Sequence, residues 1–317
     1  MKLSSEQIKT ITVGAVSITE EPDGMHFFKC TDKQNKAWAE LRQELGYRAL
    51  TTTGVRLDFH TDSQNLGFTV SGGKFELYVD NLLRGQYNAG ESSDIRVKLC
   101  DPLGDEQTEY RVTLYFPSHS IGVLKSLEID DGAKIFKHFY GTKILFIGDS
   151  ITQGWNTKYD SLSYAYRVSR YFNAESVIQG VGGGFFCADT FDSVPFAPEA
   201  VVVAYGTNDF GHDITLDEFR KRANDHLTLI SKEYKGKHIF VISPIWRDKR
   251  DGRKMGTFQQ CRQVIAELAD ELNMIHIDGL SLVPPLPELF ADGYLHPNSE
   301  GFSLFAENLA FEMSMYI

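Results

Sequence analysis

The sequence predicts an all-β sandwich over residues 1–140, followed by a three-layer α/β domain over residues 141–317. Apolar and polar residues alternate in several short segments of the first part, whereas short, continuously apolar runs fill the second part. The alternation is typical of half-buried antiparallel strands, and the continuous runs are typical of parallel strands covered on both faces. The pattern changes near Tyr140 and Gly141.

In the first part, alternating segments are separated by segments rich in turn residues, as a sandwich requires. A helical pattern at residues 36–45 interrupts this series. The predicted strands are at residues 55–59, 74–80 and 110–116, and the predicted turns are at 71–73, 88–90 and 102–104.

In the second part, predicted strands and helices alternate along the chain. This order is typical of a parallel sheet with helices on both faces. The best-marked helix begins at a capping box formed by Thr215 and Glu218. The predicted strands are at residues 144–147, 176–178, 201–204, 238–242 and 274–277, and the predicted helices at 215–230, 258–272 and 302–309.

Composition and charge narrow the class of protein. The chain has 317 residues and a net charge of -11, which disfavours a nucleic-acid binder because such proteins carry basic surfaces. The four cysteines are Cys30, Cys100, Cys187 and Cys261; they form no C-x-x-C pair, so we expect reduced thiols. No metal-binding motif such as HExxH is present.

The N-terminus lacks an apolar run, and no stretch approaches the ~18 apolar residues of a membrane span. We therefore expect neither a signal peptide nor a membrane partner, and a cytoplasmic protein, or a secreted one if a leader has been removed. The sequence does not indicate an oligomeric state.

A serine follows the first apolar run of the second part. Ligands bind outside the carboxyl ends of parallel strands, so the residues after each run are candidates for a functional site. Gly148, Asp149 and Ser150 follow residues 144–147. A serine at a strand-to-helix turn exposes its hydroxyl, and the N-terminus of the next helix favours developing negative charge. An ordinary turn serine is the alternative for these residues alone.

Potential hydrogen-bond donors follow the next two strands. Gly182, Gly183 and Gly184 come after residues 176–178, and such a loop lets a backbone N–H approach a substrate oxygen closely. The loop lacks the spacing of a dinucleotide or phosphate loop. Asn208 follows the third strand, where its amide can donate to an oxyanion. A tight turn and an Asx-turn are the respective alternatives.

A histidine in a proline-rich loop after the last strand completes the set. His296 precedes a predicted helix, and Asp292 lies four residues earlier. An imidazole can act as a base and a nearby carboxylate can orient it, although a lone loop histidine is usually solvated. Together the candidates would place a nucleophile, oxyanion donors and a base at one edge of one sheet, as acyl transfer requires.

Four short blocks resemble those of the SGNH hydrolase superfamily, also called GDSL esterases. They are residues 148–150, Gly183, residues 206–209 and residues 296–298. The resemblance implies a flavodoxin-like α/β/α fold. It also implies hydrolysis of esters or thioesters of sugars, lipids or other small acyl compounds, and catalysis without a metal or cofactor.

The same resemblance implies a role for each residue. Ser150 would be the nucleophile and would donate its N–H to the oxyanion. Gly183 would donate its backbone N–H and Asn208 its side-chain amide. His296 would act as general base and then as general acid.

Gly182 and Gly184 flank the glycine donor, so its assignment is open by one residue. This sequence also departs from the family pattern at two points. The asparagine often found a few residues before that glycine is absent, because Ile178, Gln179 and Gly180 stand there. The family usually places its aspartate three residues before the histidine, where Gly293 stands, and Asp292 is four residues before His296. A one-residue bulge would bring Asp292 to the imidazole; otherwise a backbone carbonyl would orient the ring and leave a Ser–His dyad.

The two-domain layout is similar to that of carbohydrate acetyl esterases, including the second carbohydrate esterase family, in which a jelly-roll-like domain precedes the catalytic one. It implies a small-molecule partner, an acylated sugar, and hydrolysis of a short acyl ester such as acetyl. The alternatives are a lipid or thioester acyl hydrolase and, from another class, a non-catalytic carbohydrate-binding protein. Aromatic residues near the predicted strand ends could stack on a sugar or pack at a domain junction: Trp155, Tyr159, Phe185, Phe186 and Trp246.

Overall fold

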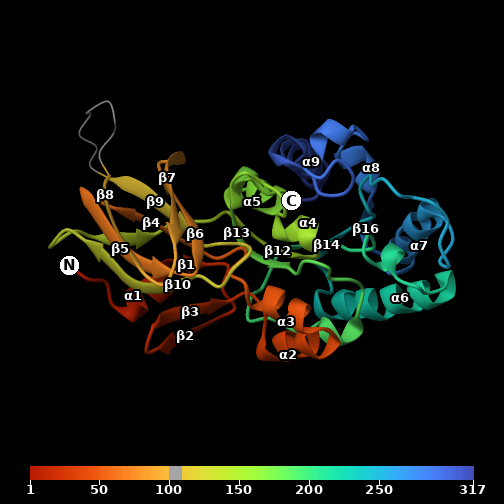
Figure 1. The fold of residues 1–317 in the computed structure, drawn as a ribbon, viewed down its shortest axis with the longest axis horizontal. Coiled ribbons are helices and arrows are strands. Elements are labelled where there is room, and N and C mark those ends of the chain that lie inside the picture. The colour runs from red at the N-terminus through yellow and green to blue at the C-terminus, as the bar shows by residue number, and fades with distance from the viewer. Residues whose placement is uncertain (100–108) are drawn as a thin grey trace. The chain divides into compact units, whose positions relative to one another are not determined.

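The computed structural model describes residues 1–99 and 109–317 (Figure 1). The chain divides into two compact units: unit 1 comprises Met1–Lys29 and Leu50–Tyr140, and unit 2 comprises Cys30–Ala49 and Gly141–Ile317. Cys100 and the turn predicted at residues 102–104 lie outside the described residues.

Within its described residues, unit 1 consists of two antiparallel sheets and one short helix. One sheet has the strand order β2-β3-β10-β5-β8, and the other has the order β1-β4-β9-β6-β7, with β11 paired to β4. The helix is α1 (Ser5–Ile11), and the strands are β1 (Thr12–Val13), β2 (Ser17–Glu21), β3 (Gly24–Phe28), β4 (Arg56–Thr61), β5 (Asn65–Ser71), β6 (Gly73–Val79), β7 (Leu82–Ala89), β8 (Ser93–Lys98), β9 (Tyr110–Tyr115), β10 (Val123–Ile129) and β11 (Ile135–Lys137).

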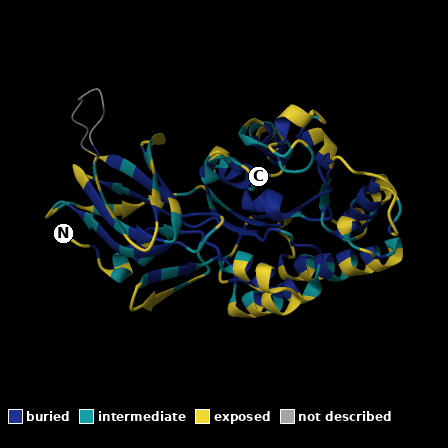
Figure 2. Cartoon of the chain, viewed as in Figure 1, coloured by how far each residue is buried: buried dark blue, intermediate teal, exposed yellow. Residues whose placement is uncertain are grey.

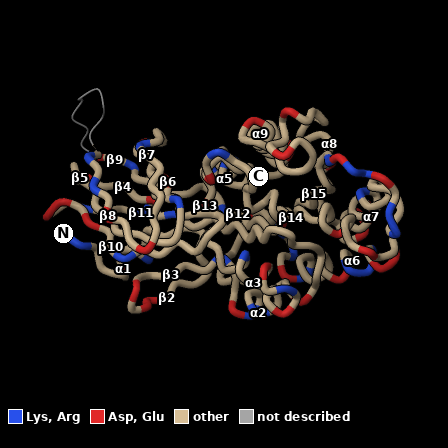
Figure 3. Tube along the Cα trace, viewed as in Figure 1, with Lys and Arg blue, Asp and Glu red and all other residues tan. Residues whose placement is uncertain are grey.

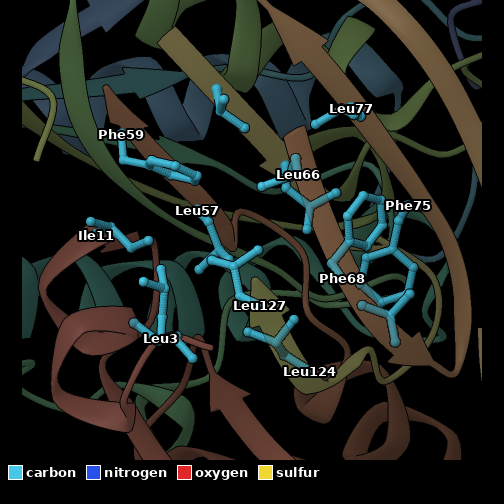
Figure 4. Close-up of a cluster of buried hydrophobic side chains, with 14 of the residues drawn as sticks. Leu3, Ile11, Leu57, Phe59, Leu66, Phe68, Phe75, Leu77, Leu124 and Leu127 are labelled. Carbon is cyan, nitrogen blue, oxygen red and sulfur yellow. The ribbon is translucent and has the colours of Figure 1, made fainter. Parts of the chain in front are cut away.

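An apolar core lies between the two sheets of unit 1. Leu57 and Phe59 of β4 contribute to it from one sheet, and Phe68 of β5 and Leu127 of β10 from the other (Figure 4). All four side chains are fully buried. Burial of large apolar side chains from both inner faces is what holds a β-sandwich together, so the predicted sandwich is confirmed.

The prediction of a half-buried strand at residues 55–59 is wrong in one respect, because the polar residues there are buried as well. Arg56 is 4% exposed and Asp58 is 1% exposed. Arg111 donates two hydrogen bonds to Asp58, at 2.9 and 2.7 Å, and the Tyr140 hydroxyl donates a third. A buried carboxylate requires such partners, and no alternation pattern in the sequence reveals that they are present.

Unit 2 is built on a parallel sheet with the strand order β13-β12-β14-β15-β16. Its strands are β12 (Thr142–Gly148), β13 (Ala174–Gly180), β14 (Ala200–Ala204), β15 (His238–Ile242) and β16 (Ile275–Ile277). Its helices are α2 (Asp32–Leu41), α3 (Gln43–Leu50), α4 (Ser150–Gln153), α5 (Tyr164–Tyr171), α6 (Leu216–Glu233), α7 (Phe258–Glu271), α8 (Gly279–Leu282) and α9 (Ser299–Met313).

Helices cover both faces of this sheet. Helix α5 packs against α9, and α6 packs against α7; Figure 1 shows these pairs on opposite sides of the strands. The central strands are accordingly buried over most of their length, with Phe146, Val201 and Val203 at 0% exposure (Figure 2). This confirms the predicted three-layer α/β domain. Numbered along the chain, the strand order is 2-1-3-4-5, which is the flavodoxin-like order, and ligands bind at the point where it reverses.

The helix predicted at residues 36–45 differs from the observed structure. Two helices, α2 and α3, replace it, because Arg42 adopts an extended conformation (φ -161°, ψ 138°) between them. Both helices pack into unit 2, so the predicted division at residue 140 does not account for them. Trp38 of α2 and Leu45 of α3 are buried with Phe185 of unit 2.

Positively and negatively charged residues are interspersed along α6 and α7 (Figure 3), and Arg220 of α6 pairs with Glu267 of α7 at 2.6 Å. In the described part of the chain, no helix combines the length and apolar character that crossing a bilayer demands. No cluster of three or more metal-ligating side chains occurs among these residues either. Cys30, Cys187 and Cys261 form no disulfide with one another.

Candidate active site

The turn between β12 and α4 carries Ser150 at the first helical position. Asp149 caps the helix, since its Oδ1 accepts a hydrogen bond from the Ile151 N–H at 2.9 Å. Gly148 is required there, because a Cβ at this position would lie 2.1 Å from the Thr152 hydroxyl oxygen and 2.8 Å from the Ala204 carbonyl oxygen. Strand and helix therefore approach closely, and the Ser150 side chain stands at the carboxyl end of the sheet.

The imidazole of His296 lies between Ser150 and Asp292. Its Nε2 is 2.8 Å from the Ser150 Oγ, and its Nδ1 is 2.7 Å from the Asp292 Oδ2. A carboxylate accepts a hydrogen bond from Nδ1, which leaves Nε2 to accept the serine proton. The three side chains form a connected chain of hydrogen bonds, as a nucleophile, its base and the group that orients the base would.

Asp292 is held by the backbone of its own loop. Its Oδ1 accepts hydrogen bonds from the N–H groups of Tyr294, Leu295 and His296, at 3.0, 2.8 and 3.1 Å. Partial burial raises the pKa of this carboxyl, but these N–H groups and the imidazole outweigh burial and hold the pKa below its ordinary value. Asp292 is therefore a carboxylate at neutral pH.

The extra residue between Asp292 and His296 is absorbed by Gly293, which has a φ of +73°. Few residues other than glycine adopt this left-handed conformation without strain. The loop bulges at this point and the carboxylate still reaches the imidazole. Of the two arrangements left open by the sequence, the structure contains the one in which Asp292 contacts His296.

In the glycine loop after β13, the backbone N–H groups of Gly182 and Gly184 have acceptors within the protein. The Gly182 N–H donates to the Gln153 Oε1 at 2.7 Å, and the Gly184 N–H donates to the Val181 carbonyl at 2.8 Å. No acceptor for the Gly183 N–H occurs among the described residues. Gly183 also has a φ of +80°, which favours glycine.

Asn208 follows β14 and lies against the same loop. Its Nδ2 donates to the Gly184 carbonyl at 2.8 Å and approaches the Asp149 Oδ2 at 3.4 Å. The first contact is a firm hydrogen bond and the second is long. The amide is thus fixed mainly by the Gly184 carbonyl, and its contact with Asp149 is the weaker of the two.

Two carboxyl groups lie buried behind the site. Burial raises the pKa of Asp149 to about 7 and that of Asp209 to about 8, against opposing backbone hydrogen bonds. The hydrogen bond from the Phe186 N–H to Asp209, at 3.2 Å, links the segment after β14 to the glycine loop. A neutral Asp149 would place no negative charge beside an oxyanion that forms at Ser150.

The serine, glycine, asparagine and histidine segments belong together in sequence as well as in space: residues 146–304 match the GDSL-like lipase/acylhydrolase family. The chain belongs to this family. It is therefore a carboxylic ester hydrolase of the GDSL type, and the resemblance to SGNH hydrolases is confirmed. No curated protein sequence matched the chain.

Solved structures show the same fold as this GDSL-type hydrolase at low sequence identity. The salicylyl-acyltransferase SsfX3 from a tetracycline biosynthetic pathway has a TM-score of 0.82 and 19% identity, over 96% of this chain and 94% of that one. A family two carbohydrate esterase from Clostridium thermocellum, in complex with cellohexaose, has a TM-score of 0.69 and 16% identity, over 96% and 98%. An acetyl xylan esterase from Butyrivibrio proteoclasticus has a TM-score of 0.67 and 13% identity, over 99% and 98%.

The GDSL-type hydrolase thus brings all the predicted site residues to one end of its sheet. Sequence reasoning missed two neighbours of that site: Arg48, which donates to the Gly182 carbonyl, and Gln153, which accepts from the Gly182 N–H. A third neighbour, Trp155, was singled out, and it stacks on His296 at 5.8 Å between ring centroids. Only Trp155 carried a signal, as an aromatic residue near a strand end. Arg48 carried none, because it lies 134 positions from the glycine it contacts.

The other aromatic residues singled out from the sequence serve mainly in packing. Phe186 is fully buried, Phe185 packs edge-on against Trp38, and Trp246 packs against Phe290. Tyr159 and Trp155 are partly exposed.

Proposed function

We propose that the chain hydrolyses a short acyl ester, an acetyl ester of a carbohydrate, through an acyl-enzyme on Ser150. The observation that carries the proposal is the Ser150–His296–Asp292 relay, together with a Gly183 N–H that has no acceptor among the described residues. Such an arrangement supplies a nucleophile, a base with an orienting carboxylate, and a donor for a developing oxyanion.

The proposed reaction has two halves. The Ser150 Oγ attacks the ester carbonyl carbon while His296 Nε2 takes the hydroxyl proton, and the tetrahedral oxyanion accepts hydrogen bonds from the Ser150 and Gly183 N–H groups and the Asn208 amide. The intermediate collapses, and His296 donates the proton to the departing alcohol oxygen. Water then attacks the acyl-enzyme, His296 accepts a proton from the water, and Ser150 is released with its proton restored.

Asp292 acts through His296 in this scheme. Its carboxylate holds the imidazole with Nδ1 protonated and stabilises the imidazolium that forms in each half-reaction. The three backbone N–H groups that bind Asp292 keep it ionised and fixed in place.

The surroundings of the glycine loop support a small acyl group on a polar alcohol. Arg48, Gln153 and Trp155 lie against the loop or its neighbours, and they are polar or amphipathic side chains. A long hydrocarbon chain would need an apolar channel instead. Two structurally similar proteins, a family two carbohydrate esterase bound to cellohexaose and an acetyl xylan esterase, support a sugar ester as substrate.

A series of nitrophenyl esters of increasing acyl length, together with acetylated xylo-oligosaccharides, tests the proposal. We expect the highest kcat/KM for acetyl, a decline as the chain lengthens, and release of acetate from the oligosaccharides. In Ser150→Ala, the rate should fall by a factor on the order of 10⁶. A preference for long acyl chains or for thioesters would favour the lipid or thioester hydrolase instead.

A further inference from the structure

Arg48 on α3 contacts the peptide group that carries the candidate oxyanion donor. Its Nη1 donates to the Gly182 carbonyl oxygen at 2.8 Å. The Gly182 carbonyl and the Gly183 N–H belong to one peptide group, which is planar and trans, so the two bonds point in opposite directions. A donor that fixes the carbonyl oxygen therefore also fixes the direction of the Gly183 N–H.

The contact also changes how well that N–H donates. A hydrogen bond from a charged guanidinium is stronger than one between neutral groups, and it polarises the peptide group it binds. Withdrawal of electron density toward the carbonyl oxygen leaves the N–H on the opposite side more positive. The Gly183 N–H is thus strengthened as a donor to an anionic oxygen.

The loop is held from its other side by Gln153, whose Oε1 accepts from the Gly182 N–H at 2.7 Å. The same oxygen accepts from the Trp155 indole N–H at 3.1 Å. The Arg48 guanidinium lies 5.0 Å from the centre of the Trp155 ring, and that ring stacks on the imidazole of His296. Arg48 is therefore in contact with the supports of both the glycine loop and the histidine.

The space around Gly183 shows how closely α3 approaches. A Cβ on Gly183 would lie 3.1 Å from the Arg48 Nη1 and 3.4 Å from the Leu45 Cδ2. Helix α3 is itself anchored, because Leu45 and Trp38 are buried in a cluster with Val181 and Phe185, which flank the glycines. Movement of the glycine loop away from its observed position would therefore separate several packed groups.

We propose that Arg48 is a positioning residue of the oxyanion hole: its guanidinium orients and polarises the Gly182–Gly183 peptide group so that the Gly183 N–H faces the tetrahedral intermediate. Arg48 does not touch the reacting atoms and acts through this peptide group. The proposal rests on the proposed function, in which Gly183 stabilises the oxyanion.

The decisive comparison is among wild type, Arg48→Met and Arg48→Lys on nitrophenyl acetate. Methionine keeps much of the apolar stem but donates no hydrogen bond, whereas lysine keeps a charged donor. We expect Arg48→Met to lower kcat on the order of 10–10²-fold, below the 10²–10³ cost of deleting a donor, with KM nearly unchanged. Arg48→Lys should recover most of the loss, because a charged donor is restored.

Arg42→Met is the matched control, since Arg42 is an exposed arginine at the junction of α2 and α3. It should retain wild-type kcat. Guanidinium ion added to Arg48→Ala should raise kcat, because it restores the missing donor; a variant that has only lost its structure would not respond. This rescue experiment also tests the role of Arg48 if Arg48→Met does not fold. Unchanged kcat in Arg48→Met, an effect on KM alone, or no recovery by either lysine or guanidinium would overturn the proposal.

Assays of wild type and Ser150→Ala under the same conditions distinguish failure of the role proposed for Arg48 from failure of the proposed function. If wild type turns over esters through Ser150 and Arg48→Met matches it, only the role of Arg48 is wrong. If Ser150→Ala is as active as wild type, the proposed function itself is wrong.

Discussion

Asp292 is the residue whose role is most sharply testable, because it stands one position away from the usual family spacing. It contacts His296 Nδ1 at 2.7 Å. We expect Asp292→Asn to lower kcat on the order of 10²–10⁴-fold, because an amide no longer enforces the correct tautomer or stabilises the imidazolium. Steady-state kinetics on nitrophenyl acetate measure this, with Asp248→Asn, an exposed aspartate, as the control. Near-wild-type kcat in Asp292→Asn would mean that a Ser–His dyad suffices.

Single residues were predictable from sequence where their chemistry is tied to a short motif. Ser150 and His296 each follow a strand within such a motif, and the structure places them in hydrogen-bond contact. The contact between Asp292 and His296 was left open, because it depends on the φ of Gly293, a conformational detail that spacing alone does not give. Arg48 was not predictable at all, because its contact with Gly182 arises only from tertiary packing.

Helices α2 and α3 are attached to the catalytic unit through a buried pair of side-chain amides. Gln34 and Gln179 exchange hydrogen bonds of 3.1 and 2.9 Å, and both are almost fully buried. Gln34→Met removes both bonds, together with the hydrogen bonds of Gln34 to the Thr31 N–H and the Thr190 carbonyl oxygen. We therefore expect the free energy of unfolding to fall by about 1–3 kcal/mol. Urea denaturation measures this change.

The double variant Gln34→Met/Gln179→Met supplies the internal control for this pair. It should recover part of the lost stability, because replacing both partners by apolar groups of similar shape is nearly neutral. Gln43→Met, at the exposed start of α3, should lie within about 0.5 kcal/mol of wild type. A single variant no less stable than Gln43→Met would show that the pair does not anchor the helices.

The elements of the sheet were predictable because a buried parallel strand has an apolar sequence wherever it occurs. Strands β12, β14 and β15 coincide closely with the predicted runs. The segment at residues 36–45 shows what such patterns omit: an amphipathic helix reveals that it has a buried face but not which unit covers that face. Its partners, among them Phe185, lie far along the chain.

At the scale of the whole molecule, buried carboxyl groups make the stability of the chain depend on pH. Burial raises the pKa of Asp149 from its ordinary value of 3.8 to about 7. Between these values the folded chain binds a proton that the unfolded chain has released, so this contribution to stability is complete below pH 3.8 and is lost as the pH rises through about 7. In Asp149→Asn the side chain does not titrate, so this contribution to the pH dependence of stability is absent.

We therefore expect wild type to lose stability relative to Asp149→Asn, on the order of 2 kcal/mol, as the pH is raised from about 5 to about 8. Urea denaturation of both proteins at the two pH values measures the difference. A difference that stays constant, or that moves in favour of wild type at the higher pH, would contradict the assignment.

The two-part organisation was predictable in kind, since the change from alternating to continuous apolar patterns marks a change from sandwich to α/β sheet. Its boundaries were not, because Cys30–Ala49 leaves one unit and packs into the other. A sequence read in order from one end assigns each segment to its neighbours along the chain. Tertiary contacts such as the hydrogen bond from the Thr31 hydroxyl to Asp192, at 2.7 Å, are what place the segment Cys30–Ala49 in unit 2.

The role of Ser150 as nucleophile is tested most directly by finding the residue to which a nitrophenyl alkylphosphonate attaches. This reagent leaves a tetrahedral phosphonyl group on the nucleophile that attacks it. Peptide mass spectrometry of the inactivated protein locates that group. We expect one phosphonyl group per chain, on Ser150, with loss of esterase activity in proportion to labelling. Complete inactivation with Ser150 unmodified, or labelling of another residue at the same rate in Ser150→Ala, would contradict it.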